Sequence, residues 1–246
     1  MKIVVDAMGG DNAPQEIVKG AAMALSKDKD LKVVLTGDEQ KIKSMLAGLT
    51  YDKARLEVIN CTEVITNDDT PTLAIRQKKD SSLVVALKLL KEDEEVQGFV
   101  SAGSTGAVLT GALLRVGRIR GISRPAVCPA LPTAKGGKVL IIDAGANAEC
   151  KPVNLAHFAL MGTAYAKAAG VKDPRVGLVT NGTEDHKGDP LHQEAHNLLK
   201  TLPGINFVGN VEGRDIMGGD IDVAVCDGFS GNIALKTTEG TALALM

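Results

Sequence analysis

The chain has 246 residues, a formal net charge of −2, 44% hydrophobic residues and only 2% aromatic residues. That length and hydrophobic content are enough to bury a sizeable core, which excludes a disordered chain. Nucleic-acid binding is a poor expectation, because the chain has neither a basic excess nor the aromatic rings on which bases stack.

Short apolar runs alternate with helical patterns along nearly the whole chain, which predicts an α/β fold with a mostly parallel sheet and right-handed crossovers. Strands are expected at residues 2–5, 32–35, 56–59, 98–101, 126–131, 139–142, 176–179, 206–208 and 223–225. Helices are expected at residues 14–26, 39–46, 73–91, 106–116, 152–169, 190–199 and from about 231 onward. Pro14, Pro152 and Pro190 each lie where a first helical turn would begin, a position that needs no N–H donor.

We expect one large α/β catalytic unit over residues 1–246, with a crossover between two lobes near the Arg- and Pro-rich residues 115–132. The last residues, 241–246, are apolar and helix-forming without a stop signal, so the natural protein is expected to continue. No secretory signal is visible at the N-terminus. The uncharged stretch 97–114 contains turn residues and is not expected to span a membrane.

The four cysteines lie far apart in the sequence: Cys61, Cys128, Cys150 and Cys226. The absence of a C-x-x-C pair argues against a zinc ribbon or a dithiol redox site and is typical of reduced thiols in the cytoplasm. His192 and His196 are four residues apart, but not in an H-E-x-x-H motif. We interpret them as part of a solvated helix face and expect no metal site.

Five polar motifs follow apolar strands. They are V-D-A-M-G-G-D (5–11), S-A-G-S-T-G-A (101–107), D-A-G-A-N (143–147), N-G-T-E-D-H-K-G (181–188) and D-G-F-S-G-N (227–232). A parallel sheet gathers its ligands at the carboxyl ends of its strands, so we expect these motifs to converge on one crevice. Glycine allows close backbone approach, and helix N-termini present unpaired N–H groups. The combination suits a phosphate or a developing oxyanion.

Each motif also has a simpler interpretation. Residues 5–11 and 101–107 fit ordinary strand-to-helix turns, since the first lacks the dinucleotide spacing and the second lacks the lysine of a Walker A loop. Asp143 is either a turn residue or a group aimed at substrate. Residues 181–188 fit a solvated polar loop, and 227–232 a capping turn. Arg214 suits a phosphate or carboxylate but also fits an ion pair with Glu212 or Asp215.

Taken together, the motifs resemble the bacterial phosphate acyltransferase of phospholipid synthesis, which moves a fatty acyl group from acyl carrier protein to inorganic phosphate. The resemblance also includes G-I-S-R-P-A (121–126) and G-N-V-E-G-R-D (209–215), and it covers essentially the whole chain. Ser104 stands where the family usually has Asn, and Ser230 where it usually has Thr. The resemblance implies a three-layer, doubly wound α/β fold akin to isocitrate dehydrogenases and phosphotransacetylases.

The reaction of this family suggests roles for the motif residues. Phosphate would be held by Lys187, Arg214 and the loop Ser104, Thr105 and Gly106. Asn181 or Asn232 would stabilise the oxyanion, and His186 would protonate the departing thiolate. The remaining substrate-binding candidates are Asp6, Gly9, Gly10, Asp11, Asp143, Asn147, Glu184, Asp227 and Lys236. An acid-free basic cluster, expected either to be solvated or to dock the acidic carrier protein, consists of Arg115, Arg118, Arg120 and Arg124.

The resemblance further implies a homodimer in the cytoplasm, peripherally associated with the inner face of the cell membrane and acting before a glycerol-3-phosphate acyltransferase. No cofactor or metal is expected. A phosphotransacetylase using an acyl-coenzyme A thioester is the alternative enzyme, and a non-catalytic regulator that binds an acyl carrier is the alternative from another class. A dehydrogenase is disfavoured, because the nucleotide fingerprint is absent.

Overall fold

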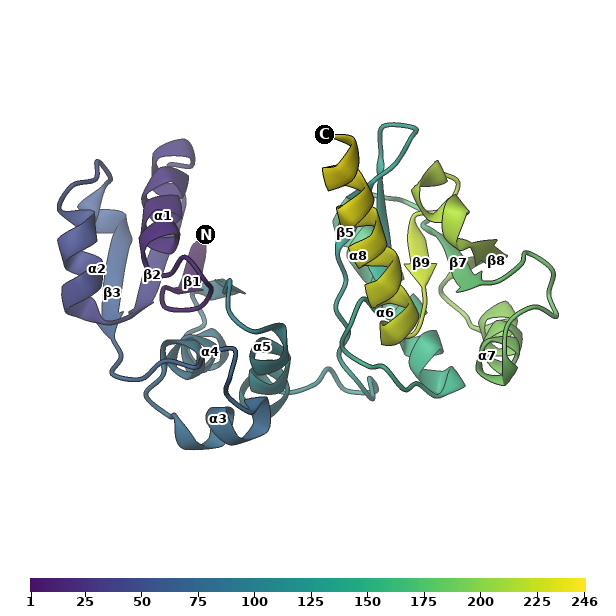
Figure 1. Ribbon diagram of the computed structural model, residues 1–246, viewed down its shortest axis with the longest axis horizontal. Coiled ribbons are helices and arrows are strands. Elements are labelled where there is room, and N and C mark those ends of the chain that lie inside the picture. The colour runs from purple at the N-terminus through teal and green to yellow at the C-terminus, as the bar shows by residue number, and fades with distance from the viewer. The chain divides into compact units, whose positions relative to one another are not determined.

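The computed structural model describes residues 1–246, and its internal contacts divide the chain into two compact units, Met1–Arg118 and Ile119–Met246. Each unit contains its own β-sheet with helices on both faces (Figure 1). The fold class is therefore α/β with mostly parallel strands, as the sequence predicted. No helix is both long enough and apolar enough to cross a lipid bilayer.

The first unit is built on four parallel strands in the order β3-β2-β1-β4. The strands are β1 (Lys2–Asp6), β2 (Lys32–Gly37), β3 (Leu56–Asn60) and β4 (Val96–Val100). The helices are α1 (Gln15–Lys27), α2 (Glu39–Leu46), α3 (Pro71–Gln77), α4 (Ser82–Glu92) and α5 (Thr105–Gly111), with the short helices η1 (Lys53–Arg55) and η2 (Ala112–Val116).

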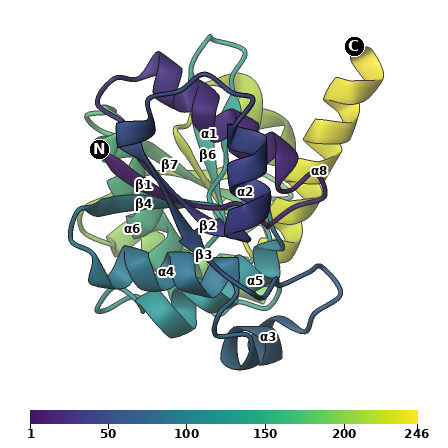
Figure 2. The same ribbon diagram turned by 90° about the vertical axis from the view of Figure 1, so that its left-hand side faces the viewer.

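Alternation along β2 decides which helices cover each face of the first sheet. Val33 and Leu35 pack into a cluster with the apolar residues of α1 and α2. Val34 points to the other face, where it packs with Val4 and with Ala86 of α4. Successive side chains of a strand point to opposite faces, so this apolar strand is buried on both sides. Figure 2 shows the sheet of this unit with α1 and α2 on one side and α4 and α5 on the other.

The second unit has five strands in the order β5-β6-β9-β7-β8, all parallel except β5, which pairs antiparallel with β6. The strands are β5 (Ala130–Pro132), β6 (Lys138–Ile142), β7 (Arg175–Thr180), β8 (Asn206–Glu212) and β9 (Val223–Val225). The helices are α6 (Pro152–Ala168), α7 (Pro190–Thr201), η3 (Gly213–Gly218) and α8 (Gly228–Leu245).

The same alternation gives the second unit two core layers. Leu140 and Ile142 of β6 belong to a cluster with apolar residues of α6 and α7. Val139 and Ile141 belong to a cluster on the opposite face, with Ile216 of η3 and the partly buried apolar residues at the start of α8. Figure 1 shows α8, in yellow, lying across its face of the sheet. Each unit is thus a three-layer sandwich.

The order in which the chain adds strands reverses once in each sheet. In the first unit the chain runs outward from β1 to β2 and β3, then returns to the other side of β1 as β4. In the second unit β9 inserts between β6 and β7 after the chain has passed through β8. Ligands of open α/β sheets bind at the carboxyl ends of strands where the order reverses. The polar motifs follow β1, β4, β6, β7 and β9 at those ends.

Three sequence predictions of local structure were wrong in extent. The helix expected at 73–91 is two helices, because Ser81 caps α4 by accepting a hydrogen bond from the Val84 N–H and the chain turns before it. Of the strand expected at 126–131, only residues from Ala130 onward pair with β6. The helix expected at 106–116 changes from α to π geometry after Gly111.

Candidate functional site

In the first unit, Asp6 joins the loops that follow β1 and β4. Its side chain is 2% exposed, and its Oδ2 accepts a hydrogen bond from Ser101 Oγ at 2.8 Å. The Met8 N–H donates to its Oδ1 at 3.2 Å, and the Gly103 N–H donates to Ser101 Oγ at 3.1 Å. The carboxylate therefore organises both turns.

Gly9 is required where these two loops meet. A Cβ at this position would lie 2.5 Å from Asp6 Oδ2 and 2.9 Å from Ser101 Oγ. No side chain fits there, so the motifs at 5–11 and 101–107 pack directly against each other, with Gly10 beside the backbone of Ala102. These two strand-end motifs form one surface, as parallel strand order predicts.

The helix that follows β4 begins at this surface. Ser104 is the N-cap of α5 and accepts a hydrogen bond from the Ala107 N–H at 3.5 Å. Thr105 and Gly106 are exposed in the first turn. Asp11 is also exposed and lies 3.5 Å from Asn67 Nδ2.

In the second unit, Asp143 is fully buried at the end of β6. Its Oδ1 accepts hydrogen bonds from the backbone N–H groups of Val127 and Ala146, at 2.9 and 3.0 Å. Its Oδ2 accepts from the backbone N–H and the side-chain Nδ2 of Asn147, at 2.7 and 2.8 Å. Four donors occupy this carboxylate, so the structure uses it to shape the turn.

The N-terminus of α8 packs closely on that turn. Asp227 caps the helix by accepting hydrogen bonds from the Phe229 and Ser230 N–H groups. A Cβ on Gly231 would lie 1.9 Å from the carbonyl oxygen of Asp143, so only glycine permits this approach. The exposed side chain of Asn232 lies beside Gly145, with its Oδ1 3.5 Å from a Cβ built there.

A cavity of about 460 Å³ lies at the carboxyl ends of β7 and β8. Its polar lining comes from the loop after β7, the start of α7 and the start of α8. The lining residues are Val179, Thr180, Asn181, Gly188, Asp189, His192, Gly213, Ile216, Phe229, Ser230, Ile233 and Ala234. Motifs 181–188, 209–215 and 227–232 thus border one cavity within this unit. Arg214 and Asn232 are sequence neighbours of lining residues but do not themselves line it.

His192 was not selected from the sequence, yet it lines this cavity. Its Nδ1 lies 2.7 Å from Asp189 Oδ1, and its Nε2 lies 3.7 Å from Asp227 Oδ2. Burial acts to raise the pKa of Asp189, but hydrogen bonds from the backbone and ring of His192 outweigh it and hold that pKa below its usual range. The signal in the sequence was D-P-x-H, in which a helix N-cap lies one turn before a histidine.

The interpretation of the two histidines as a solvated helix face was wrong. The side chain of His192 is 12% exposed, and His196 is 1% exposed. The His196 ring contacts Asn210 of β8. The His192 ring lines the cavity, near Asp189 and Asp227. The sequence interpretation rested on the absence of an H-E-x-x-H motif, which argues against a metal site but says nothing of burial.

The 181–188 loop is closed by its own hydrogen bonds. Asn181 Oδ1 accepts from the Gly188 N–H at 3.0 Å. The carbon chain of Lys187 packs over Gly182, and the structure gives its ammonium no carboxylate partner. Asp185 has a lowered pKa because it accepts a hydrogen bond from Lys200. His186 is exposed, and its carbonyl accepts from Gln193 Nε2 at 2.9 Å.

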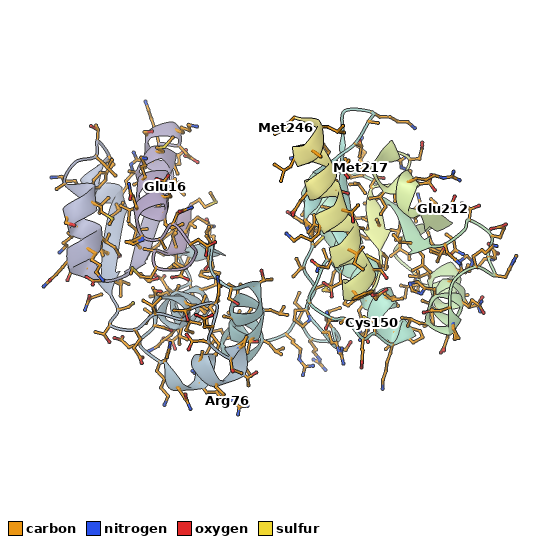
Figure 3. All side chains as sticks on the ribbon, viewed as in Figure 1. Glu16, Arg76, Cys150, Glu212, Met217 and Met246 are labelled. Carbon is orange, nitrogen blue, oxygen red and sulfur yellow. The ribbon has the colours of Figure 1, made fainter.

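Two cationic side chains that were predicted to bind substrate, Arg214 and Lys236, form ion pairs with neighbouring acidic residues. The side chain of Arg214 is 80% exposed and pairs with Glu212 and Asp215. Figure 3 labels Glu212 at the end of β8. Lys236 pairs with Glu239 one turn later on α8, at 2.7 Å.

The arginine cluster is distributed over the boundary of the two units. Arg115 donates to the Ile75 carbonyl at 2.6 Å, and Arg124 donates to the Glu149 carbonyl at 2.9 Å. Arg118 and Arg120 are exposed. Arg115 and Arg118 belong to the first unit, and Arg120 and Arg124 to the second.

The cysteines near the second unit's turns do not have the character of nucleophiles. Burial raises the pKa of the Cys128 thiol to about 11, and it raises the pKa of Cys226 still further. Burial also raises the pKa of Cys150. The thiolate is the reactive form of cysteine, so these thiols are inert at neutral pH.

Comparison with solved structures extends the fold assignment. A phosphotransacetylase from Streptococcus pyogenes matches with a TM-score of 0.71 and 21% identity, over 99% of this chain and 82% of that one. The EutD phosphotransacetylase from Staphylococcus aureus matches with a TM-score of 0.69 and 21% identity, over 98% of this chain and 82% of that one. These structural similarities confirm the prediction that the fold resembles that of phosphotransacetylases.

Sequence comparison identifies the family. The family model described as "Fatty acid synthesis protein" matches residues 1–246. A phosphate acyltransferase from Clostridium tetani (strain Massachusetts / E88) is 55% identical over 98% of this chain and 72% of its own length. One from Alkaliphilus oremlandii (strain OhILAs) is 54% identical over 98% of this chain and 71% of its own length. The chain therefore belongs to the phosphate acyltransferase family, which its motifs had indicated.

Proposed function

We propose that this protein transfers a fatty acyl group from acyl carrier protein to inorganic phosphate, giving an acyl phosphate for phospholipid synthesis. The observation that carries the proposal is the 55% identity to a phosphate acyltransferase over nearly the whole chain. Family membership supports phosphate as the acyl acceptor. The carrier protein as donor is the finer part of the proposal.

The chemistry is a direct displacement. A phosphate oxygen attacks the thioester carbonyl carbon, a C–O bond forms, and the carbonyl oxygen becomes an oxyanion. The C–S bond then breaks, and the phosphopantetheine thiolate leaves and takes a proton from water or from a side chain such as His186. The raised pKa values of the buried cysteines favour this route over an acyl-cysteine intermediate. Catalysis then rests on positioning and on charge stabilisation.

Lys187 is the principal phosphate ligand in this proposal. Its ammonium has no carboxylate partner, whereas Arg214 is already paired with Glu212 and Asp215. Within the first unit, the N–H groups at the start of α5, around Ser104, Thr105 and Gly106, are proposed as a phosphate-binding group in their own right. Asp6, Gly9 and Gly10 would shape the surface beside them.

Lys187→Ala is expected to raise the KM for phosphate about 10-fold to 100-fold, since hydrogen bonds to charged groups contribute about 1.5–3 kcal/mol. Arg214→Ala is expected to have a smaller effect, because its carboxylate partners already neutralise part of its charge. Initial rates measured against phosphate concentration give both values. Lys172→Ala, at an exposed position of the same unit, is the control, and an unchanged phosphate KM in Lys187→Ala would remove that residue from the role.

A basic cavity in the first unit supports docking of the carrier protein near Arg115. The cavity has a volume of about 430 Å³ and is lined by Lys79, Val84, Lys88, Lys91, Glu92, Leu114 and Arg115. Four cations thus face a single carboxylate. Lys91 donates to the Val116 carbonyl at 2.9 Å, so its charge is not used in an ion pair. We propose that an acidic helix of the carrier protein binds this cavity of the first unit, with Arg118, three residues after Arg115, as a further cation.

The kcat/KM for the carrier-bound substrate is expected to fall as salt is raised, because screening weakens attraction between exposed charges. Lys79→Glu combined with Lys88→Glu should lower kcat/KM about tenfold or more at low salt and flatten the salt dependence. Lys167→Glu combined with Lys172→Glu, at two exposed positions away from the cavity, is the matched double charge reversal. Salt-independent kinetics with the wild-type protein would contradict the docking model.

The decisive test of function incubates the protein with acyl carrier protein thioester and phosphate, and traps acyl phosphate with hydroxylamine. Acyl hydroxamate that requires both substrates supports the proposal. A preference for acyl-coenzyme A would identify a phosphotransacetylase instead. Absence of product with either donor would leave a non-catalytic carrier-binding role.

The proposal extends to assembly in the cell. We propose a homodimer associated with the inner face of the cell membrane, supplying acyl phosphate to a glycerol-3-phosphate acyltransferase. The support is apolar exposure on α8, where Phe229 is 63% exposed, Ile233 51% and Leu243 73%. Size-exclusion chromatography tests the homodimer, and sedimentation of the protein with vesicles tests the membrane association.

A further inference from the structure

A buried amide in β8 connects the sheet to the 181–188 loop. Asn210 is 5% exposed, and its side chain bonds in two directions. Its Nδ2 donates to the carbonyl oxygen of Glu184 at 2.8 Å, and its Oδ1 lies 2.8 Å from His196 Nδ1. Nothing in the proposed reaction uses this residue directly, although it belongs to the motif at 209–215, which begins inside β8.

The Glu184 carbonyl is the point at which the loop turns. The backbone N–H of Lys187 donates to the same oxygen at 3.0 Å, so one acceptor closes the 184–187 turn and receives the Asn210 amide. The side chain of Lys187 then packs back over Gly182. The position of the Lys187 backbone is therefore fixed, through one shared carbonyl, by a side chain of the sheet.

His196 sets the orientation of the amide. The Nδ2 of Asn210 is committed to the Glu184 carbonyl, so Oδ1 faces the imidazole and accepts a hydrogen bond from Nδ1–H. The ring is 1% exposed and packs edge-on against Phe207, with ring centroids 5.2 Å apart. Its Nε2 lies 3.4 Å from Asp185 Oδ1 but forms no hydrogen bond. The imidazole thus contacts the sheet through Asn210, whose amide it orients.

The other bonds of the loop do not replace this connection. Gln193 Nε2 binds the carbonyls of His186 and Gly188, each at 2.9 Å, from the exposed side of α7. Asn181 Oδ1 binds the Gly188 N–H. These contacts hold the far half of the loop to α7 or to the loop itself. Lys200 of α7 binds the exposed side chain of Asp185, not the backbone of the turn. Asn210 holds the 184–187 turn to the core of the sheet.

We infer that Asn210 is a positioning residue for phosphate binding, acting through the Glu184 carbonyl on Lys187, with His196 orienting its amide. This inference rests on the proposed function, in which Lys187 holds phosphate. A rigidly placed ammonium binds its anion without first losing conformational freedom, so loosening the turn weakens phosphate binding. The acyl donor does not depend on this turn in the proposal.

Asn210→Asp tests the inference most directly. The carboxylate keeps an acceptor for His196 but has no N–H for the Glu184 carbonyl and repels it. The KM for phosphate is expected to rise about tenfold, while the KM for the acyl donor stays within about twofold. His196→Phe keeps an aromatic ring against Phe207 but frees the amide to rotate, and a rise of about threefold in phosphate KM is expected. Asn197→Asp, at an exposed position of α7, is the matched charge control.

The kinetic constants separate positioning from a purely structural role. A lower melting temperature with an unchanged phosphate KM in both variants overturns the inference, because loss of folded protein lowers the maximal rate without changing KM. If Asn210→Asp does not fold, His196→Phe decides alone, and an unchanged phosphate KM there overturns the inference. A wild-type protein that makes no acyl phosphate from phosphate would instead contradict the proposed function.

Discussion

Asn232→Ala is expected to lower kcat by about 10²–10³, the usual cost of losing one donor that stabilises an oxyanion. Asn232 lies in the first turns of α8, beside Gly145, and its side chain is exposed with no hydrogen bond to the protein. Its amide is therefore available to donate to a substrate oxygen without first breaking an internal bond. The N–H groups of the same helix terminus add a favourable field for negative charge.

Single-turnover rates and the KM for phosphate measure this effect separately. A donor that acts mainly on the transition state lowers kcat and kcat/KM together and changes the phosphate KM little. Thr237→Ala, exposed on the same helix, is the control for a general effect on α8. An unaltered kcat in Asn232→Ala would transfer the role to Asn181, whose Oδ1 binds the Gly188 N–H and whose Nδ2 remains to donate.

The local pattern of apolar and polar residues was enough to predict most of the strands and helices. Val139 to Ile142 form an uninterrupted apolar run, and that run is the strand β6, buried on both faces by α6 and α8. The prediction of a single helix at 73–91 was wrong, because the turn between α3 and α4 depends on contacts with residues distant in the sequence. Asp80 binds the Thr62 N–H and hydroxyl, and Ser81 caps the next helix, so the chain turns where periodicity alone continues.

The motifs predicted which residues lie together within each unit but not what each residue does. Asp143 was equally compatible with a turn and with substrate contact, and only the four donors around it show that its oxygens are occupied. The burial of His196 and Asn210 was not predicted, because it depends on the packing of α7 against β8. The expectation that both units contribute to one crevice stays a prediction.

Asp143→Ala is expected to lower the free energy of unfolding of the second unit by about 3 kcal/mol or more. The substitution leaves four N–H donors without an acceptor in a fully buried place, and each buried donor left unpaired costs about 1–3 kcal/mol before relaxation. The loss also removes the turn on which Gly231 packs. Urea denaturation followed by circular dichroism measures the change.

Two further variants identify the cause of that loss. Asp143→Asn keeps an acceptor for the Val127 and Ala146 N–H groups but turns an N–H toward Asn147, so an intermediate loss is expected. Asp220→Ala removes an exposed carboxylate that pairs with Lys135, and its expected cost is below about 1 kcal/mol. A cost for Asp143→Ala no larger than that of Asp220→Ala would mean that water or backbone movement satisfies the donors. The turn would then be shaped by the packing of Gly231 on its backbone rather than by the carboxylate.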